Sequence, residues 1–486
     1  MSLSSALSIA QSSIRNTGRQ TSVVSRNVQE SGNPDYSRRT AVLSSTAPGA
    51  RVVDIQRATN EQLFRQNMSA VSAWNAQSTL YAGMESLGLA VNGVDNATSA
   101  ATAIGKLQEA LQLYSSTPSN RNLGENTLDA ARGVVRSLND GTTAIQTFRV
   151  QTDQEIAGAV TDLNSLLADF KDANNLVVTG TRTGRDVNDA LDQRDATLKK
   201  IAEYIPVTTL NRGDNDLVLT TKDGVTLFET VPRSVTFTPA TAYAAGSAGN
   251  SVQIDGVPIG AGAGGNTNAS GKIAGLLQLR DSVASTMQAQ LDEVARGLIT
   301  AFAEKDPSGA LPDAAGLFTW QGGPAIPPAG QLVDGLAGSI RLNAAIDTEQ
   351  GGAVTLLRDG GANGPGYVVN TNGDASYSGL LIDLADRMDA PIAFDTDVGL
   401  APSASLSNYS SSAIGWFESV RQEASRATEA KQALAVRTAE ALSNETGVNV
   451  DEEMSLLLDL EHSFEASARL LKAVDEMLAA LFAAVS

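Results

Sequence analysis

The stretch "SLLLDLEHSFEASARLLKAVDEMLAALFAAV", Ser455 to Val485, decides the fold, because apolar or small side chains recur in it at alternating spacings of three and four. This spacing is the heptad pattern of a helix that packs against a partner along one seam. The seam positions are Leu457, Leu460, Phe464, Ser467, Leu471, Val474, Leu478, Leu481 and Val485. The pattern therefore predicts a long C-terminal helix with one interface-forming face.

A matching seam lies near the other end of the chain, at Leu3, Leu7, Ala10, Ile14, Thr17, Thr21, Val24 and Val28. Residues 1–57 hold seven arginines against three acidic residues, whereas residues 445–486 hold nine acidic residues against two basic ones. Opposite charge favours pairing of the two ends with each other as a coiled coil. An exposed ion pair contributes only about 0.2 to 1 kcal/mol, so we expect apolar burial to supply most of the stability.

The N-terminal helix is broken within "NVQESGNPDYSRRT", Asn27 to Thr40. Gly32 and Pro34 are residues that end helices, and Tyr36 offers a ring that can anchor the turn. We therefore expect the chain to leave the coiled coil here and to enter another domain.

The sequence pattern changes twice between the ends. Alanine-rich helices are expected up to Tyr204, β-hairpins around "DLVLTTKDGVTLFETV", and helix again from Gly271. The fold class expected is mainly α with a small β insertion, in discontinuous nested domains with an α-helical second domain and a β-rich outer domain. The expected boundaries are residues 1–57 with 445–486 for the terminal coiled coil, 58–205 with 272–305 and 403–444 for the helical domain, 206–271 for the β-rich outer domain, and 306–402 for a loop-rich segment associated with the helical domain.

Composition argues against several functions. The net charge of −19 argues against a nucleic-acid partner, and the chain has no cysteine and a single histidine, His462, which is expected at a solvated or interface position. Gly260, Gly262 and Gly265 match a dinucleotide fingerprint, but no helix pattern follows, so we interpret them as a loop. We expect no catalytic residues, no cofactor, no metal and no membrane insertion. Without an apolar signal segment, the chain is expected to be cytoplasmic or exported without a cleaved leader.

The segment "NVQESGNPDYSRRT", Asn27 to Thr40, resembles the Asn-rich, Pro/Gly-Tyr segment that ends the first helix of the bacterial flagellar axial proteins. That family includes rod, hook and hook-associated proteins. The C-terminal "TGVNVDEEMSLLLDLEHSFEASARLLKAVDEMLAALF" resembles that family's terminal segment, and "LDQRD", Leu191 to Asp195, is similar to an internal feature of hook-associated protein 1. The residues that carry the resemblance are Asn27, Asn33, Pro34, Tyr36, Leu191, Asp192, Gln193, Arg194, Asp195, Gly447, Asn449, Asp451, Glu452 and Glu453.

The resemblance implies a structural, non-enzymatic subunit that joins the hook to the filament as a junction ring between two different helical assemblies. It implies contacts with copies of itself, hook protein, a second junction protein (hook-associated protein 3), the flagellar export apparatus and a cytoplasmic export chaperone at the C-terminal helix. It also implies export unfolded by the flagellar type III system to the extracellular flagellum. The implied interface residues are Leu3, Leu7, Ile14, Val24, Val28, Leu457, Leu460, Phe464, Leu471, Val474, Leu478 and Leu481.

Two alternatives remain open on the sequence. The first alternative is that the chain is a hook-associated protein 3 or a hook-type axial protein. The motif "LDQRD" argues against both. From a different class, it is an extracellular enzyme or adhesin carried on flagellar termini, with residues 206–402 as the functional part, although that region shows no catalytic constellation.

Overall fold

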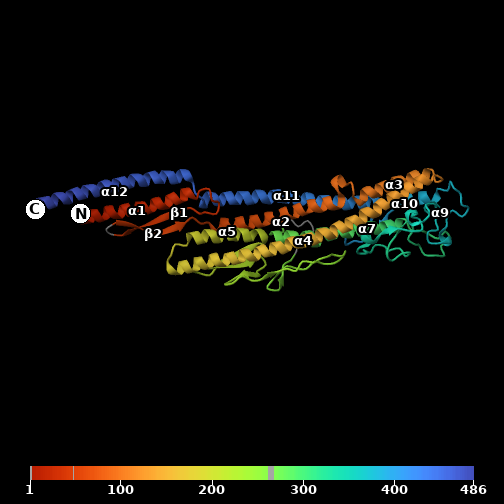
Figure 1. The fold of residues 1–486 in the computed structure, drawn as a ribbon, viewed down its shortest axis with the longest axis horizontal. Helices are drawn as coiled ribbons and strands as arrows, with labels where there is room; N and C mark the ends of the chain where they lie inside the picture. The colour runs from red at the N-terminus through yellow and green to blue at the C-terminus, as the bar shows by residue number, and fades with distance from the viewer. Residues whose placement is uncertain (1–2, 47–48, 261–267, 486) are drawn as a thin grey trace. The chain divides into compact units, whose positions relative to one another are not determined.

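The structure, a computed structural model, describes residues 3–46, 49–260 and 268–485 and is mainly helical with small antiparallel sheets (Figure 1). The α-helices are α1 (Leu3–Gln29), α2 (Glu61–Asn92), α3 (Ala100–Ser116), α4 (Arg121–Thr183), α5 (Asn188–Tyr204), α6 (Lys272–Gln278), α7 (Ala284–Ala301), α8 (Leu336–Ser339), α9 (Thr355–Asp359), α10 (Gly379–Asp389), α11 (Leu406–Thr446) and α12 (Val450–Val485). Short 3₁₀ turns are η1 (Val94–Asn96), η3 (Thr348–Gln350) and η4 (Pro365–Tyr367), and η2 (Leu279–Val283) is a π-helical turn between α6 and α7. The predicted fold class, mainly α with a small β insertion, is confirmed.

The strands are short and form separate small sheets. They are β1 (Arg39–Thr46), β2 (Gly49–Arg57), β3 (Val207–Asn211), β4 (Leu217–Thr221), β5 (Thr226–Phe228), β6 (Val235–Thr236), β7 (Gln253–Ile254), β8 (Val257–Pro258), β9 (Phe318–Thr319), β10 (Arg341–Leu342), β11 (Ile392–Ala393) and β12 (Ser403–Ala404). The sheets among the described residues are β1-β2, β3-β4-β5, β6-β7-β8, β9-β10 and β11-β12.

The chain divides into two compact units. The first comprises residues 1–74, 161–235 and 430–486, and the second comprises residues 75–160 and 236–429. The divisions fall inside α2, α4 and α11, so each of these helices contributes residues to both units. The boundaries of these two units differ from those of the four domains expected from the sequence. The four domains stay a prediction.

In the first unit, α1 and α12 lie side by side, as the two seams predict (Figure 1). Ala10, Thr17 and Val24 of the first seam are at most 4% exposed, and Leu460 and Val474 of the second are 6% and 2% exposed. The seam prediction fails at two positions. Phe464 is 46% exposed and Leu481 is 52% exposed, because a single facing helix covers only a narrow stripe of α12.

The expected charge pairing between the two ends is present at Arg38, in the segment after α1, which pairs with Glu453 of α12 at 2.6 Å. Within the described residues no ion pair joins α1 itself to α12, and their polar links include a hydrogen bond of 2.7 Å between the hydroxyls of Ser13 and Ser467 and the bond from Asn27 to Glu453. The basic residues of α1 lie on another side of the helix, where Arg19 donates to the Val52 carbonyl and Arg26 pairs with Asp189. Opposite net charge of two segments does not place their charged side chains on facing sides.

The first part of the β insertion packs on α4 and α5 within the first unit. Phe228 of β5 meets Phe170 of α4 edge to face, with ring centroids 5.0 Å apart, and both rings are buried. Leu219 and Leu227 are fully buried beside them. Strands β7 and β8 belong to the second unit, so the insertion contributes to both cores.

The second unit is built around α7. Most side chains of α7 are buried, including the ion pair of Glu293 and Arg296 one turn apart, with both side chains 0% exposed. The Glu293 carboxylate also accepts from the Asp395 amide at 2.8 Å, so the pair is hydrogen-bonded as well as neutralised. In the described residues no helix is long and apolar enough to cross a membrane.

Candidate functional site

The residues that carry the motif signals meet in the first unit, at the end of α1. We call the cluster Asn27, Tyr36, Arg38, Arg39, Arg57, Asp189, Asp192, Asp195 and Glu453 the polar junction. It joins α1, the segment that follows it, the β1-β2 hairpin, α5 and the first turn of α12. It thus connects parts of the chain that lie more than four hundred residues apart, since Asn27 contacts Glu453 over a separation of 426.

Asn27 is the centre of the junction and is 1% exposed. Its amide nitrogen donates to the Arg39 carbonyl at 2.9 Å and to the Glu453 carboxylate at 3.0 Å. Its amide oxygen accepts from the Tyr36 hydroxyl at 2.8 Å and from the Arg39 amide at 3.1 Å. Two donated and two accepted bonds use the full capacity of a primary amide, which explains why asparagine and not aspartate stands at this position.

Glu453 attaches α12 to the junction. Its side chain is 1% exposed and accepts from Asn27 and, at 2.6 Å, from Nε of Arg38. The Asn449 side chain caps the same helix by accepting from the Asp451 amide at 3.1 Å, and the acidic first turn complements the helix dipole. The Arg38 amide donates to the Thr446 carbonyl at 2.8 Å, so side-chain and backbone bonds act together here.

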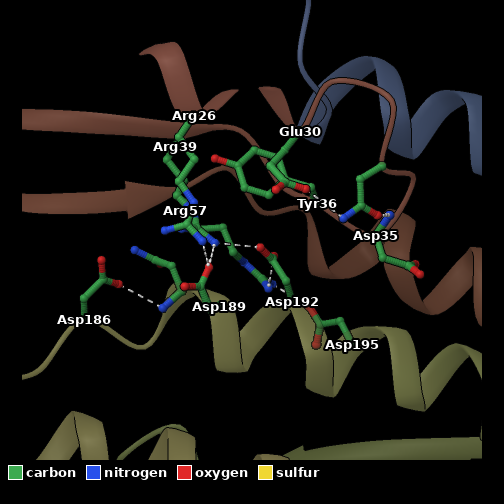
Figure 2. A network of polar contacts seen from close by, with 12 residues as sticks. Arg26, Glu30, Asp35, Tyr36, Arg39, Arg57, Asp186, Asp189, Asp192 and Asp195 are labelled. Atoms are coloured by element: carbon green, nitrogen blue, oxygen red, sulfur yellow. Dashed lines mark hydrogen bonds and ion pairs between the residues drawn. The ribbon is translucent and has the colours of Figure 1, made fainter. Parts of the chain in front are cut away.

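The arginines of the hairpin meet a row of carboxylates on α5. Antiparallel pairing places Arg39 directly opposite Arg57 at the base of the hairpin. Residues three apart on a helix share a face, so Asp189, Asp192 and Asp195 all point toward these arginines, as Figure 2 shows. Asp192 receives Arg39 on one oxygen and Arg57 on the other, each at 3.0 Å.

The protonation behaviour follows from this geometry. Burial raises the pKa of Asp192, and the Arg57 and Arg39 guanidinium groups offset that rise only in part. Burial also acts to raise the pKa of Asp189, but hydrogen bonds from Arg26 and Arg39 outweigh it and hold the pKa below its usual value. Burial raises the pKa of Tyr36, whose ring lies 4.8 Å from the Arg39 guanidinium. Burial and arginine contacts therefore act in opposite directions on the carboxylates of the junction.

The segment after α1 has the turn that the sequence predicts. The helix ends at Gln29, and the Asn33 side chain accepts from the Asp35 amide at 3.1 Å, while Pro34 is exposed. Lys199 of α5 pairs with Asp35 at 3.0 Å, and Tyr36 is buried as the predicted anchor. These contacts direct the chain from α1 into β1.

The five residues of "LDQRD" divide between two neighbours. Asp192 and Asp195 face the hairpin, whereas Arg194 lies on another side of α5 and donates to the Asn174 side chain at 3.2 Å and to the Asn215 carbonyl. Leu191 is half-buried and Gln193 is exposed. The motif therefore fastens both the hairpin and the β insertion to α5.

An open polar cavity of about 250 Å³ adjoins the junction. Its lining includes Arg26, Glu30, Asp35, Tyr36 and Gln193. The carboxylates of the junction are engaged by arginines, and the described residues hold no cluster of histidine, aspartate or glutamate suited to a metal ion. The hydrogen bonds and ion pairs of this site hold separate chain segments together.

The other predicted residues lie as follows. Gly447 ends α11 with its amide donating to the Ser443 carbonyl at 2.7 Å, and a Cβ there would lie 2.5 Å from that oxygen. Asp451 and Glu452 are exposed, as is His462, while Leu3, Leu7, Ile14, Val28, Leu457, Leu471 and Leu478 are half-buried. Gly262 and Gly265 lie outside the described residues.

Sequence reasoning missed Arg38, Arg39, Arg57 and Asp189 as site residues. A signal was available. Asp189, Asp192 and Asp195 recur every three residues on a predicted helix and therefore share one face. Such a row of carboxylates indicates basic side chains on the segment that faces it. What the sequence did not indicate is that the cations come from a hairpin.

Comparison with known proteins identifies the family. The model described as the flagellar hook-associated protein FlgK helical domain matches residues 92–316, and the model of the flagellar basal body rod FlgEFG protein C-terminal segment matches residues 441–483. The chain belongs to the FlgK family of flagellar hook-associated proteins. The FlgK match contains "LDQRD", and the rod-protein match contains Glu453 and most of α12.

The fold agrees with that of a FlgK family member of known structure. The flagellar hook junction protein FlgK from Burkholderia pseudomallei has a TM-score of 0.57 to this chain and 12% sequence identity, covering 78% of this chain and 99% of that one. No curated protein sequence matches the chain. The FlgK family is a structural family of the flagellum, and the chain is a flagellar component.

Proposed function

We propose that the chain is a structural subunit of the junction between the hook and the filament of the bacterial flagellum. The single observation that carries this proposal is the polar junction, which binds the start of α12 to the end of α1 and so makes one assembly element from the two ends of the chain. Membership of the FlgK family supports the same role.

The assembly partners are copies of the chain in a ring, hook protein on one side and hook-associated protein 3 on the other. The support is the unpartnered apolar surface of α12. Leu470, Met477, Leu481 and Phe482 are 46% to 71% exposed, which is more apolar surface than one soluble helix usually leaves in water. Neighbouring subunits would cover these side chains, while the seam residues Leu460 and Val474 pack inside each chain.

The terminal residues 1–57 and 445–486 act as the assembly domain, and residues 58–205 with 272–305 and 403–444 form the helical domain. Residues 206–271 form the β-rich outer part. The arginine-carboxylate contacts of the polar junction support a rigid attachment of the terminal helices to α5. Rigid attachment is what a subunit needs if it joins two different helical assemblies.

Before assembly, a cytoplasmic export chaperone covers the apolar side chains of α12, and the flagellar export apparatus passes the unfolded chain to the outside. The absence of cysteine from the sequence suits this route, since no disulfide has to be kept reduced during transit. Hydrogen exchange of the chaperone complex tests this step. Slower exchange of α12 amides in the complex is expected, and unchanged exchange would place the chaperone elsewhere.

The test of the overall proposal is electron microscopy of flagella from a strain that lacks this gene. Hooks without filaments, with flagellin released into the medium, are the expected result. Filaments of normal number and length on the mutant cells would refute the junction role. Complete absence of hooks would instead indicate a rod or hook subunit.

A further inference from the structure

Residues 237–250 of the second unit form a segment without regular secondary structure, which we call the strap. Val235 before it and Val252 after it are 3% and 0% exposed, whereas every strap side chain is half-buried or exposed. Apolar burial therefore fixes the two ends of the strap but contributes little along its length. Some other interaction must hold the segment against the helices.

Three buried charged residues supply that interaction. Arg149 and Asp153 lie one turn apart on α4, and Arg280 lies in the π-helical turn η2. Their exposed fractions are 2%, 0% and 1%. Nη1 of Arg280 donates to the Asp153 carboxylate at 2.7 Å, so the cluster contains a fully buried ion pair.

Each member of this cluster binds the strap. Asp153 accepts from the Ala240 amide at 2.7 Å and from the Tyr243 hydroxyl at 2.9 Å. Arg280 donates to the Asn250 carbonyl at 2.8 Å.

Arg149 binds the middle of the strap. It donates to the Ser247 carbonyl at 2.6 Å, and its guanidinium lies 4.0 Å from the centre of the Tyr243 ring. Burial and the bond to Asp153 raise the pKa of Tyr243 to about 12, so its hydroxyl remains a donor across the physiological range.

The geometry of the backbone fits the same arrangement. A Cβ on Gly249 would lie 2.3 Å from Cζ of Arg280, so only glycine lets the guanidinium pass. Single π-helical turns within α-helices interrupt the regular ladder and re-aim a side chain, and η2 carries Arg280 at such a turn.

We propose that Arg149, Asp153 and Arg280 form a polar latch, and that the strap opens as a unit when this latch is broken while α4 and α7 remain folded. Buried ion clusters offset a desolvation cost with specific bonds, so removing the Asp153 charge weakens the bonds to Arg280, Ala240 and Tyr243, although Arg280 keeps its second partner, Asp281. An opened strap returns the charges to water, which makes opening the least costly response to a broken latch.

Hydrogen exchange of the full chain, read by mass spectrometry, tests the latch. Asp153→Asn removes the fully buried one of the two charges that pair with Arg280, the other being Asp281, and Gly249→Ala displaces the guanidinium without changing any charge. In both variants we expect amides of residues 240–250 to exchange at least tenfold faster, with α4 and α7 unchanged. Glu155→Gln, at an exposed position on α4, is the matched control and should exchange like the unmodified chain.

Cleavage by chymotrypsin gives a second measurement, because Tyr243 is a cleavage site inside the strap. Both variants should be cut there at least tenfold faster than the control. Unchanged exchange and cleavage of the strap in Gly249→Ala would overturn the proposal. Loss of protection in α4 and α7 together with the strap would also overturn it, because the cluster would then belong to the cooperative core. If Asp153→Asn does not fold, the exchange and cleavage of the strap in Gly249→Ala decide whether the latch exists.

Discussion

At the scale of single residues, the Asn27 amide is the central one of several links between the two ends of this chain. Asn27 uses all of its hydrogen-bonding capacity on Tyr36, Arg39 and Glu453, in a site closed to solvent. The sequence pointed to Asn27, Tyr36 and Glu453 through family resemblance, but it did not indicate that they touch. Their contact depends on tertiary packing over hundreds of residues, which no local pattern records.

Asn27→Asp should strongly destabilise the first unit. The change removes both donors and places a carboxylate beside the buried Glu453, so we expect a loss of about 2 to 4 kcal/mol in the opening free energy of α1. Hydrogen exchange of the α1 amides measures it. Adding Glu453→Gln should recover part of the loss by removing one of the two facing charges, while Asn33→Asp, exposed in the same segment, should cost less than about 1 kcal/mol. Equal protection in all variants would show that Asn27 is not the link.

Asp292 in the second unit predicts a pH dependence. Burial raises the pKa of this carboxyl to about 7, although the amides of Ala337 and Gly335 donate to it at 2.8 and 2.9 Å. A folded-state pKa above the unfolded value means that the folded state binds the proton more tightly, so the contribution to stability is greatest below about pH 4 and is lost as the pH rises through 7.

Urea unfolding at several pH values measures this contribution. Asp292→Asn should flatten the dependence between pH 4 and 7 by up to about 1.4 kcal/mol per pH unit. Parallel curves for the variant and the unmodified chain would show that Asp292 does not titrate in this range.

At the scale of elements, the seams of α1 and α12 were predictable because a heptad period survives in the sequence regardless of context. The position of the charged contacts was not, because net charge carries no direction around a helix, and the ion pair of Arg38 with Glu453 uses an arginine of the segment after α1. The β insertion was found from its strand pattern, yet its packing on Phe170 of α4 was not, since the buried face of α4 looks the same whether a helix or a sheet covers it.

The pairing of α1 with α12 can be tested by a disulfide. Ser13→Cys with Ser467→Cys should form an intramolecular bond under oxidising conditions, because the native hydroxyls are 2.7 Å apart and the chain has no other cysteine. Gel mobility of the unreduced monomer reports the bond. The pair Ser8→Cys and Ser467→Cys, with Ser8 exposed on α1, should remain reduced in the monomer. Equal cross-linking of both pairs would argue against a fixed register.

The contact between the β insertion and α4 should contribute substantially to the first unit. Phe170→Ala empties a fully buried site against Phe228 and should cost about 3 to 5 kcal/mol. Leu176→Ala on the same helix, at a position 60% exposed, should cost less than about 0.5 kcal/mol. Thermal or urea unfolding compares the two, and similar small losses would mean that the sheet packs only loosely on α4.

At the scale of the whole molecule, the chain packs its two ends together, and we propose that the outer surface of α12 binds neighbouring subunits. Leu471 and Leu470 separate these two roles, because Leu471 is a half-buried seam residue and Leu470 is 46% exposed. A charge at Leu470 should leave the isolated chain folded and yet prevent its assembly, since an unpaired carboxylate in an apolar interface is strongly unfavourable.

The most direct test is electron microscopy of a deletion strain that expresses Leu470→Asp, with Glu465→Gln on the exposed side of α12 as the control. Secretion of the variant and circular dichroism of the purified chain establish that it is exported and folded. We predict hooks without filaments for Leu470→Asp and normal filaments for Glu465→Gln. Normal filaments on cells that express Leu470→Asp would contradict the assignment of this surface to assembly.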